Sequence, residues 1–262
     1  MRKFYFVLLL VFTSLFSKDF CRTDMLAVEP NISSKEVKEE FLKYDFSSIY
    51  TQTSNDFIFG VMGNEMQRFK IKILAVSKDK DNASEYFVVG KTLRDDGKIR
   101  EFSGVIIIDA MREIMFPFIK EESLKNEDIQ EAEQIDRAGI LSAKYFFKEY
   151  GNSQTTGSFF GVLHSKWFLS KDGNMKYNDI RVDADGYFNN SFVGRFEEHS
   201  SKKRVGANWG DYRVPYVPCD FDIGEEHFLP SEKYIKNGWE NYVNAKNGDK
   251  KAQEIESSSW WK

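Results

Sequence analysis

The densest cluster of polar and aromatic side chains in this sequence is NWGDYRVP at 208–215. In it Trp209 could stack on a sugar ring, Arg213 could supply a fork of N–H donors, and Asp211 could accept hydrogen bonds. Trp167, from another aromatic-rich segment, is a further candidate for ligand stacking. The same residue types also suit a structural role, in which Asp211 and Arg213 pair at a strand end beside a core tryptophan. Both interpretations stay open.

A second cluster, DADGYFNN at 183–190, carries the oxygen-bearing side chains that calcium prefers. Asp183, Asp185 and Asn189 are the candidate ligands of an irregular calcium site. The cluster does not match an EF-hand loop, because aligning Gly186 to position 6 puts arginine at position 1 and phenylalanine at position 12. Asp-Gly and Asn-Asn pairs also adopt the left-handed conformations of turns, so a turn between strands is the favoured interpretation.

The sequence lacks the common catalytic signatures. It contains no G-x-S-x-G, no H-E-x-x-H, no Walker A loop and no G-x-G-x-x-G that opens a helix. A glycan hydrolase that uses a pair of carboxylates leaves no local pattern, because its two acids can lie far apart in the chain. That activity therefore stays an alternative.

Cys21 and Cys219 are the two cysteines of the chain, too few for a metal framework. In an oxidising compartment they could form one disulfide that fastens the amino-terminal arm, and otherwise they are two unpaired thiols. A lipid anchor on Cys21 is disfavoured, because Asp19 and Phe20 stand where lipidation signals have small residues.

Residues 1–17 have the layout of a secretory signal peptide, since Arg2 and Lys3 precede an apolar run. That run covers 4–16, whereas a membrane-spanning helix needs about 20 residues. We therefore expect export to the periplasm or the medium, with no transmembrane segment in the mature chain. Loss of two positive charges with the signal moves the net charge from −4 to −6, which argues against nucleic-acid binding.

The remaining chain divides into three parts by its hydrophobic pattern. Residues 18–56 form an arm with a short helix predicted at 31–44, where Ser33 and Glu36 have capping-box spacing. Residues 57–230 form a β domain, interrupted by an acidic helical excursion at about 117–138. Residues 231–262 form a C-terminal amphipathic helix and a tail.

The β prediction depends on side chains that alternate between apolar and polar. In RFKIKILAV (68–76) the apolar and basic residues fall on opposite faces, which is typical of a half-buried strand. An Asp-Gly pair in 94–98 predicts a hairpin. Several strands carry an aromatic residue just before a glycine, a pattern that favours bending and closure of the sheet. We expect a mainly β fold, an antiparallel meander in a closed or partly closed barrel, with a short helix near each end.

Four strings give a resemblance: YNDIRVDADGY, NNSFVGRF, NWGDYRVP and GWENY. With these, the chain over about 57–242 resembles a group of uncharacterised secreted bacterial proteins that carry NNxFxG-aromatic followed by NWGDYR-I/V-P. Arg195-Phe196 and Ala207 depart from the pattern of that group, the latter where cysteine often stands. The strand layout looks lipocalin-like, and the resemblance implies no activity.

Three functions from different classes are compatible with these features of the sequence. An aromatic content of 16% and the series of strands favour an exported binding protein for a small apolar or sugar-like ligand. The exported glycan hydrolase is the second hypothesis. The third is a structural or interaction protein of the cell envelope that has no pocket.

Overall fold

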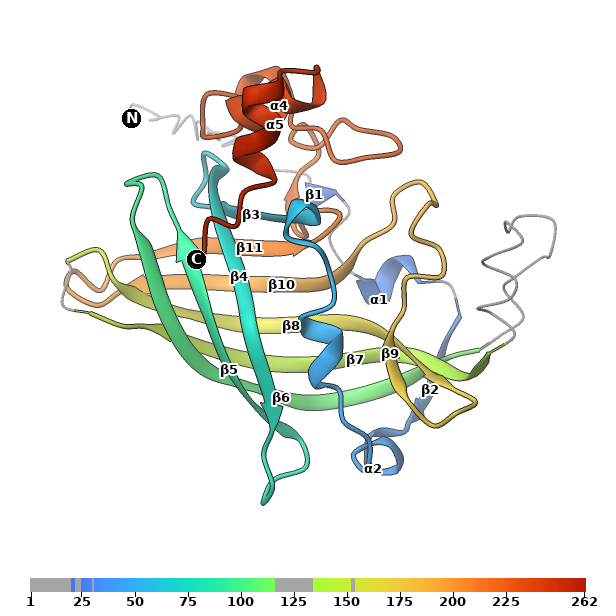
Figure 1. Cartoon of the computed structure of the whole chain (residues 1–262). Coiled ribbons are helices and arrows are strands. Elements are labelled where there is room, and N and C mark those ends of the chain that lie inside the picture. The colour runs from blue at the N-terminus through green and yellow to red at the C-terminus, as the bar shows by residue number, and fades with distance from the viewer. Residues whose placement is uncertain (1–19, 22–24, 30, 116–133, 152–153) are drawn as a thin grey trace, which may run out of the picture.

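The computed structural model describes residues 20–21, 25–29, 31–115, 134–151 and 154–262 (Figure 1). The predicted signal peptide and 117–133 of the predicted acidic excursion lie outside these ranges. The last residues of that predicted excursion are extended, because β7 begins at Ile135.

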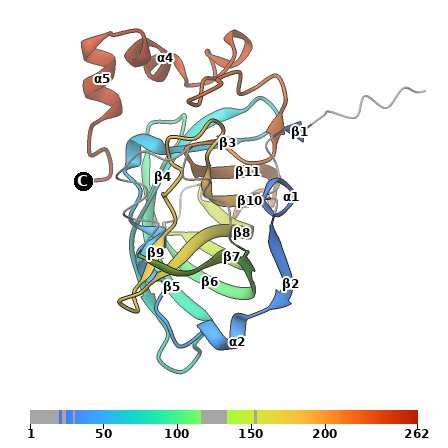
Figure 2. The same ribbon diagram turned by 90° about the vertical axis from the view of Figure 1, so that its right-hand side faces the viewer.

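An antiparallel sheet forms the body of the molecule, as predicted. Its main strands are β3 (Ile58–Met62), β4 (Gln67–Lys78), β5 (Glu85–Leu93), β6 (Ile99–Ile114), β7 (Ile135–Glu149), β8 (Gly157–Ser170), β10 (Asn189–Glu198) and β11 (Arg204–Asp211). Each of β3 to β8 pairs with the next, β11 pairs with β3 and β10, and β10 also pairs with β8. The hydrogen-bonded strands therefore close into a ring, seen from two sides in Figure 1 and Figure 2. The short β9 (Met175–Tyr177) lies beside β8.

Aromatic side chains fill the interior of this ring. Phe69, Phe147, Phe159 and Phe192 are all buried and surround Trp209, with ring centroids 4.5 to 6.3 Å from its own. Such close packing of large rings contributes both burial and pairwise aromatic attraction. The inner faces of the strands therefore form an aromatic-rich hydrophobic core.

The backbones of β8 and β10 approach each other closely at a point where two glycines meet. Gly161 pairs with Gly194, and a Cβ on Gly161 would lie 2.2 Å from the carbonyl oxygen of Val193. A Cβ on Gly194 would lie 2.2 Å from the carbonyl oxygen of Phe160. Both glycines belong to the predicted aromatic-glycine strings, and here they permit close approach of two backbones.

The amino-terminal arm differs from its prediction as a single helix over 31–44. Residues Ile32–Glu36 form strand β2, and only Lys38–Phe41 form a helical turn, α2. The reason is that β6 extends beyond its pairing with β5, so its far end offers an unpaired edge that β2 occupies. The predicted capping box does not form, because the N-cap residue of α2 is Val37 and no side chain caps this turn. Glu36 Oε1 instead accepts hydrogen bonds from the backbone N–H groups of Lys38 (2.9 Å) and Met111 (2.7 Å), which ties the arm to β6.

Further short helical turns lie along the arm. They are α1 (Met25–Val28), η1 (Ser47–Tyr50) and η2 (Asn55–Phe57). Phe41, Phe46 and Ile49 from this part of the chain are fully buried in the core of the ring. The arm therefore contributes to the main core.

The C-terminal segment forms several short helices where one was predicted. They are η4 (Glu232–Tyr234), α4 (Glu240–Lys246) and α5 (Lys250–Glu256). Gly238, with φ of 90°, separates η4 from α4. Trp239 and Tyr242 pack with Phe59 and Phe228 in a second apolar cluster outside the ring.

The basic face of β4 is covered by this C-terminal segment. Arg68 binds both carboxylate oxygens of Glu256 in α5, at 2.9 and 2.6 Å, and Lys70 lies 3.4 Å from the same carboxylate. The face of 68–76 that the alternation predicts to be exposed to solvent is therefore covered, in part, by α5 of the same chain.

A disulfide joins Cys21 to Cys219, two residues 198 positions apart in the chain. It lies where β1 (Phe20–Cys21) pairs with β12 (Val217–Pro218). Of the two alternatives that the sequence leaves open, the structure has the disulfide and not two unpaired thiols, and this bond uses the sulfur that a lipid anchor on Cys21 would need. Among the described helices, none has the length and apolarity required to cross a bilayer.

Replacing Gly161 with alanine should destabilise the protein by about 1–3 kcal/mol, because the new Cβ would overlap the β10 backbone. Gly206→Ala is the matched control, since nothing lies within 4 Å of a Cβ built at that glycine of β11. Urea unfolding of the two variants measures the difference. Equal urea midpoints for the two variants would show that the close approach of β8 and β10 at Gly161 has room for a side chain.

Candidate functional site

The carboxylate of Asp211 lies at the end of β11, 4% exposed, and joins four parts of the chain. Its Oδ2 accepts hydrogen bonds from Thr53 Oγ1 (2.7 Å), Asn190 Nδ2 (2.8 Å) and Tyr177 OH (3.0 Å). A buried carboxylate is tolerated when hydrogen bonds replace those it made to water. Asp211 therefore fixes the arm, β9 and β10 against the end of β11.

Burial raises the pKa of the Asp211 carboxyl to about 6, and the donors from Thr53, Asn190 and Tyr177 oppose part of that rise. At neutral pH the group is ionised, since its pKa lies below 7. The ionised form presents only acceptor oxygens to the three donors that surround it.

Asn189 and Asn190 hold β10 against β8. Asn189 Oδ1 accepts from the backbone N–H of Lys166 (2.7 Å), and its Nδ2 donates to the carbonyl oxygen of Lys166 (3.1 Å). Asn190 has φ of 43°, the left-handed conformation expected of this Asn-Asn pair. Its Nδ2 also donates to the carbonyl oxygen of Ile49 (2.9 Å). Both side chains are buried and engaged within the protein.

The three predicted calcium ligands lie in different surroundings. Asn189 is fully buried, whereas Asp183 and Asp185 are exposed on the turns between β9 and β10. Among the described residues, no three His, Cys, Asp or Glu side chains gather as a metal site would need. Calcium binding by this set stays a prediction.

Arg213 is buried, 2% exposed, and its guanidinium binds a neighbouring loop. It donates to Asp222 Oδ1 and Oδ2 at 2.9 and 2.8 Å, and to the carbonyl oxygens of Gly224 (2.9 Å) and Glu225 (2.7 Å). The partner of Arg213 is therefore Asp222, and the partners of Asp211 are neutral groups. The sequence shows several acids in 221–228 that could pair with Arg213, but no sequence pattern distinguishes Asp222 from the others.

A pocket of about 320 Å³ opens beside these buried groups, between the ring and the C-terminal segment. The rings of Phe57 and Tyr212 stack in its wall, with centroids 5.0 Å apart and planes at 19°. Tyr187 meets Tyr212 edge-on at 5.1 Å. Phe57 is 42% exposed, so an aromatic surface remains open to a ligand.

Tyr212 adopts an unusual backbone conformation, with φ of 67°. Bulky side chains rarely occupy this region, and residues that do so often belong to binding sites. Its neighbours Asp211 and Arg213 are both anchored by buried hydrogen bonds, and its own N–H donates to the carbonyl oxygen of Phe57 (2.7 Å). The surrounding contacts therefore hold Tyr212 in this conformation.

Negative charge surrounds the pocket. Burial raises the pKa of the Tyr212 phenol to about 12, and the carboxylates of Asp211, Asp179 and Asp183 add to the rise. Three acids, Asp56, Asp183 and Glu226, belong to the lining. Two cations, Lys246 from α4 and Arg213, also belong to the lining. The charge of Arg213 is balanced by its ion pair with Asp222, so Lys246 is left to offset the three acids. The phenol of Tyr212 stays protonated at neutral pH and can act as a donor.

The structure brings together only some of the predicted site residues. Asp183 and Arg213 line this pocket, and Asp211 lies next in the chain to Tyr212. Trp167 and Trp209 are buried in the core of the ring, 0% and 2% exposed. Sequence reasoning missed Phe57, although Tyr212 lay within the predicted cluster. Phe57 lies far from that cluster in the chain, so only the fold reveals their contact.

The fold defines a mainly β protein with a closed ring of antiparallel strands, and a pocket lies outside that ring. No protein-family model, no curated protein and no solved structure matches this chain. A function is therefore argued from the pocket itself.

Asp211 gives an expected pH dependence of stability. Its carboxyl has a higher pKa in the folded than in the unfolded chain, so the folded protein holds the proton more firmly. The contribution of this group to the free energy of unfolding should fall as pH rises from about 4 to about 6, by up to about 3 kcal/mol. In the Asp211→Asn variant, which has no carboxyl at this position, the free energy of unfolding should not show this decrease between about pH 4 and about pH 6. Urea unfolding at several pH values measures it, and parallel curves for both proteins would contradict the assignment.

Proposed function

We propose that this chain is an exported binding protein that takes a small sugar-like ligand in the pocket beside Tyr212. The observation that carries the proposal is the stacked pair of Phe57 and Tyr212, open to solvent and surrounded by carboxylates. A sugar presents an apolar C–H face that stacks on aromatic rings and hydroxyl groups that donate to carboxylates. Both kinds of partner are present in the lining.

The size and charge of the pocket support this ligand class. A volume of about 320 Å³ is at the lower end for small-molecule sites, which suits one or two sugar rings. A purely apolar ligand would displace water from Asp56 and Glu226 without offering either carboxylate a hydrogen bond. The sugar-like alternative is therefore favoured over the apolar one.

Two features support export. The disulfide between Cys21 and Cys219 is typical of an oxidising compartment. The first residues of the chain have the layout of a signal peptide. The proposed site of action is accordingly the periplasm or the medium.

The proposed pocket lies outside the ring of strands, whereas a lipocalin-like strand layout predicts a ligand site inside it. That layout implies a ligand cavity inside the strands. Here aromatic side chains pack the interior around Trp209, and the proposed pocket lies outside, against the C-terminal segment. The ligand would therefore contact loops and α4, not the inner faces of the strands.

Binding of a panel of mono- and disaccharides, measured by saturation-transfer NMR and then by calorimetry, tests the proposal. Phe57→Ala should weaken the affinity for a bound sugar by about tenfold, since stacking contributes roughly 0.5–1.5 kcal/mol. Asp183→Asn should weaken it as well. Phe87→Ala is the matched control, because Phe87 is 48% exposed on β5 and lies outside the lining.

The outcomes separate the three functional hypotheses. Saturable binding that depends on Phe57 and leaves the sugar intact supports the binding protein. Cleavage of a disaccharide in the same assay would favour the glycan hydrolase. No binding by any sugar, or equal binding by the Phe57 and Phe87 variants, would contradict the proposal and favour an interaction protein of the envelope.

A further inference from the structure

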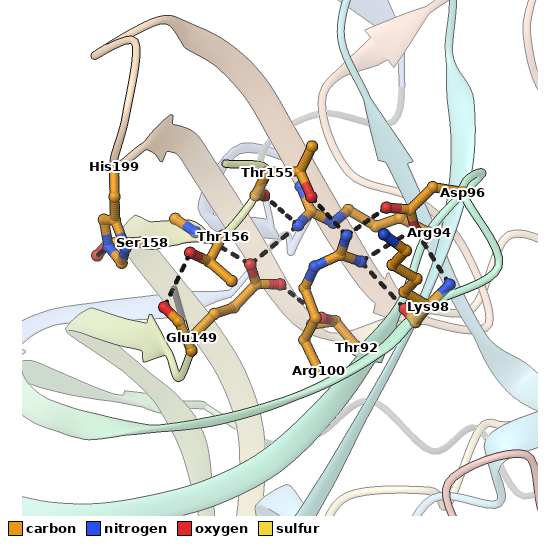
Figure 3. Close-up of polar contacts among 12 residues, drawn as sticks. Thr92, Arg94, Asp96, Lys98, Arg100, Glu149, Thr155, Thr156, Ser158 and His199 are labelled. Carbon is orange, nitrogen blue, oxygen red and sulfur yellow. Dashed lines mark hydrogen bonds and ion pairs between the residues drawn. The ribbon is translucent and has the colours of Figure 1, made fainter. Parts of the chain in front are cut away.

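A second groove, of about 840 Å³, lies on the outer surface of the ring where β7 ends and β8 begins. Ser158 and His199 lie at its edge, and Figure 3 shows their side chains next to each other. Ser158 Oγ is 2.9 Å from His199 Nε2. This is the contact of a serine nucleophile with a general base.

The fold fixes the two residues from separate strands. Ser158 pairs with Glu197 in the register of β8 and β10, and His199 follows that strand directly. The backbone N–H of His199 donates to the carbonyl oxygen of Thr156 at 2.9 Å. The backbones on both sides of the contact are therefore tied together.

A buried carboxylate next to this groove supports the start of β8 (Figure 3). Glu149 is 1% exposed and accepts hydrogen bonds from Thr92 Oγ1 (2.6 Å), Arg94 (3.0 Å) and the backbone N–H of Gly157 (3.1 Å). Gly157 precedes Ser158 in the chain. This network fixes the backbone beneath the serine, as the supporting shell of a reactive residue should.

The groove also offers an apolar surface beside the serine. Phe160 lies two residues after Ser158 on the same side of β8, and its register partner on β7 is Phe146, 47% exposed. Val105 and Phe87 continue this row across β6 and β5. An apolar acyl chain laid along the row would bring its carbonyl carbon to Ser158.

A cation is available for the oxygen of that carbonyl. Lys148 is the direct cross-strand neighbour of Ser158, and its exposed side chain lines the same groove. Paired residues of neighbouring strands have Cβ atoms about 5 Å apart, so the ammonium group can reach an oxyanion formed at Ser158.

We propose that Ser158 is a nucleophile activated by His199 and that the groove accepts a carboxylic ester with an apolar acyl chain. Ser158 Oγ bonds to the carbonyl carbon while its proton moves to His199 Nε2. The bond to the alcohol oxygen then breaks, and the alcohol leaves with that proton. Water, deprotonated by the same nitrogen, attacks the acyl-serine, releases the acid and restores Ser158.

A fluorophosphonate probe, followed by peptide mass spectrometry, tests the assignment. The probe should label Ser158, forming an Oγ–P bond and releasing fluoride. His199→Gln should slow labelling at least a hundredfold, because glutamine can keep a hydrogen bond to Ser158 but cannot take its proton. Ser201→Ala is the matched control, since Ser201 is an exposed serine of the same turn that lies outside the lining of the groove.

Hydrolysis of p-nitrophenyl butyrate gives an independent readout. The wild-type protein should release p-nitrophenol at least tenfold faster than Ser158→Ala, with unfolding curves showing that both are folded. No labelling of Ser158, equal labelling of the His199→Gln variant, or equal hydrolysis by wild type and Ser158→Ala would each overturn the proposal. Sugar binding beside Tyr212 involves other residues, so the two proposals can fail separately.

Discussion

The buried carboxylate of Asp211 is the interaction on which the candidate pocket depends. Removing a charged group from water is costly unless hydrogen bonds compensate, and here three donors converge on one oxygen. Because Thr53, Tyr177 and Asn190 come from distant parts of the chain, the same contact that satisfies the charge also brings those parts together. The residue after Asp211 is Tyr212, which is thereby held in its left-handed conformation in the wall of the pocket.

The packed interior of the ring determines where chemistry can occur. Trp209 and the phenylalanines around it occupy the volume that a hollow ring would offer to a ligand. Both candidate sites therefore lie on the outside, one against the C-terminal segment and one on the outer faces of β7 and β8. The strands act as a rigid support, and the loops and outward-facing side chains carry the proposed functions.

Sequence patterns predicted the structure correctly where interactions between residues close in the chain determine it. The alternation in 68–76 predicted a strand, and β4 covers it, while the Asp-Gly pair in 94–98 marks the turn between β5 and β6. The helix predicted for the arm was wrong because a distant part of the chain decides its structure. The free edge of β6 pairs with Ile32–Glu36, which is therefore a strand although its sequence has helical spacing. Long-range partners could not be predicted either. The contacts of Arg213 with Asp222 and of Ser158 with His199 exist only because loops or strands meet in the fold.

Native-state hydrogen exchange of Asp211→Ala tests the central role of this carboxylate most directly. If Asp211 joins four parts of the chain, its loss should speed amide exchange together in peptides that cover 49–53, 177–178, 189–191 and 211–213. The measurement compares this variant with the wild-type protein by mass spectrometry, in conditions where both remain folded. Faster exchange confined to 210–212, with the other peptides unchanged, would contradict the account.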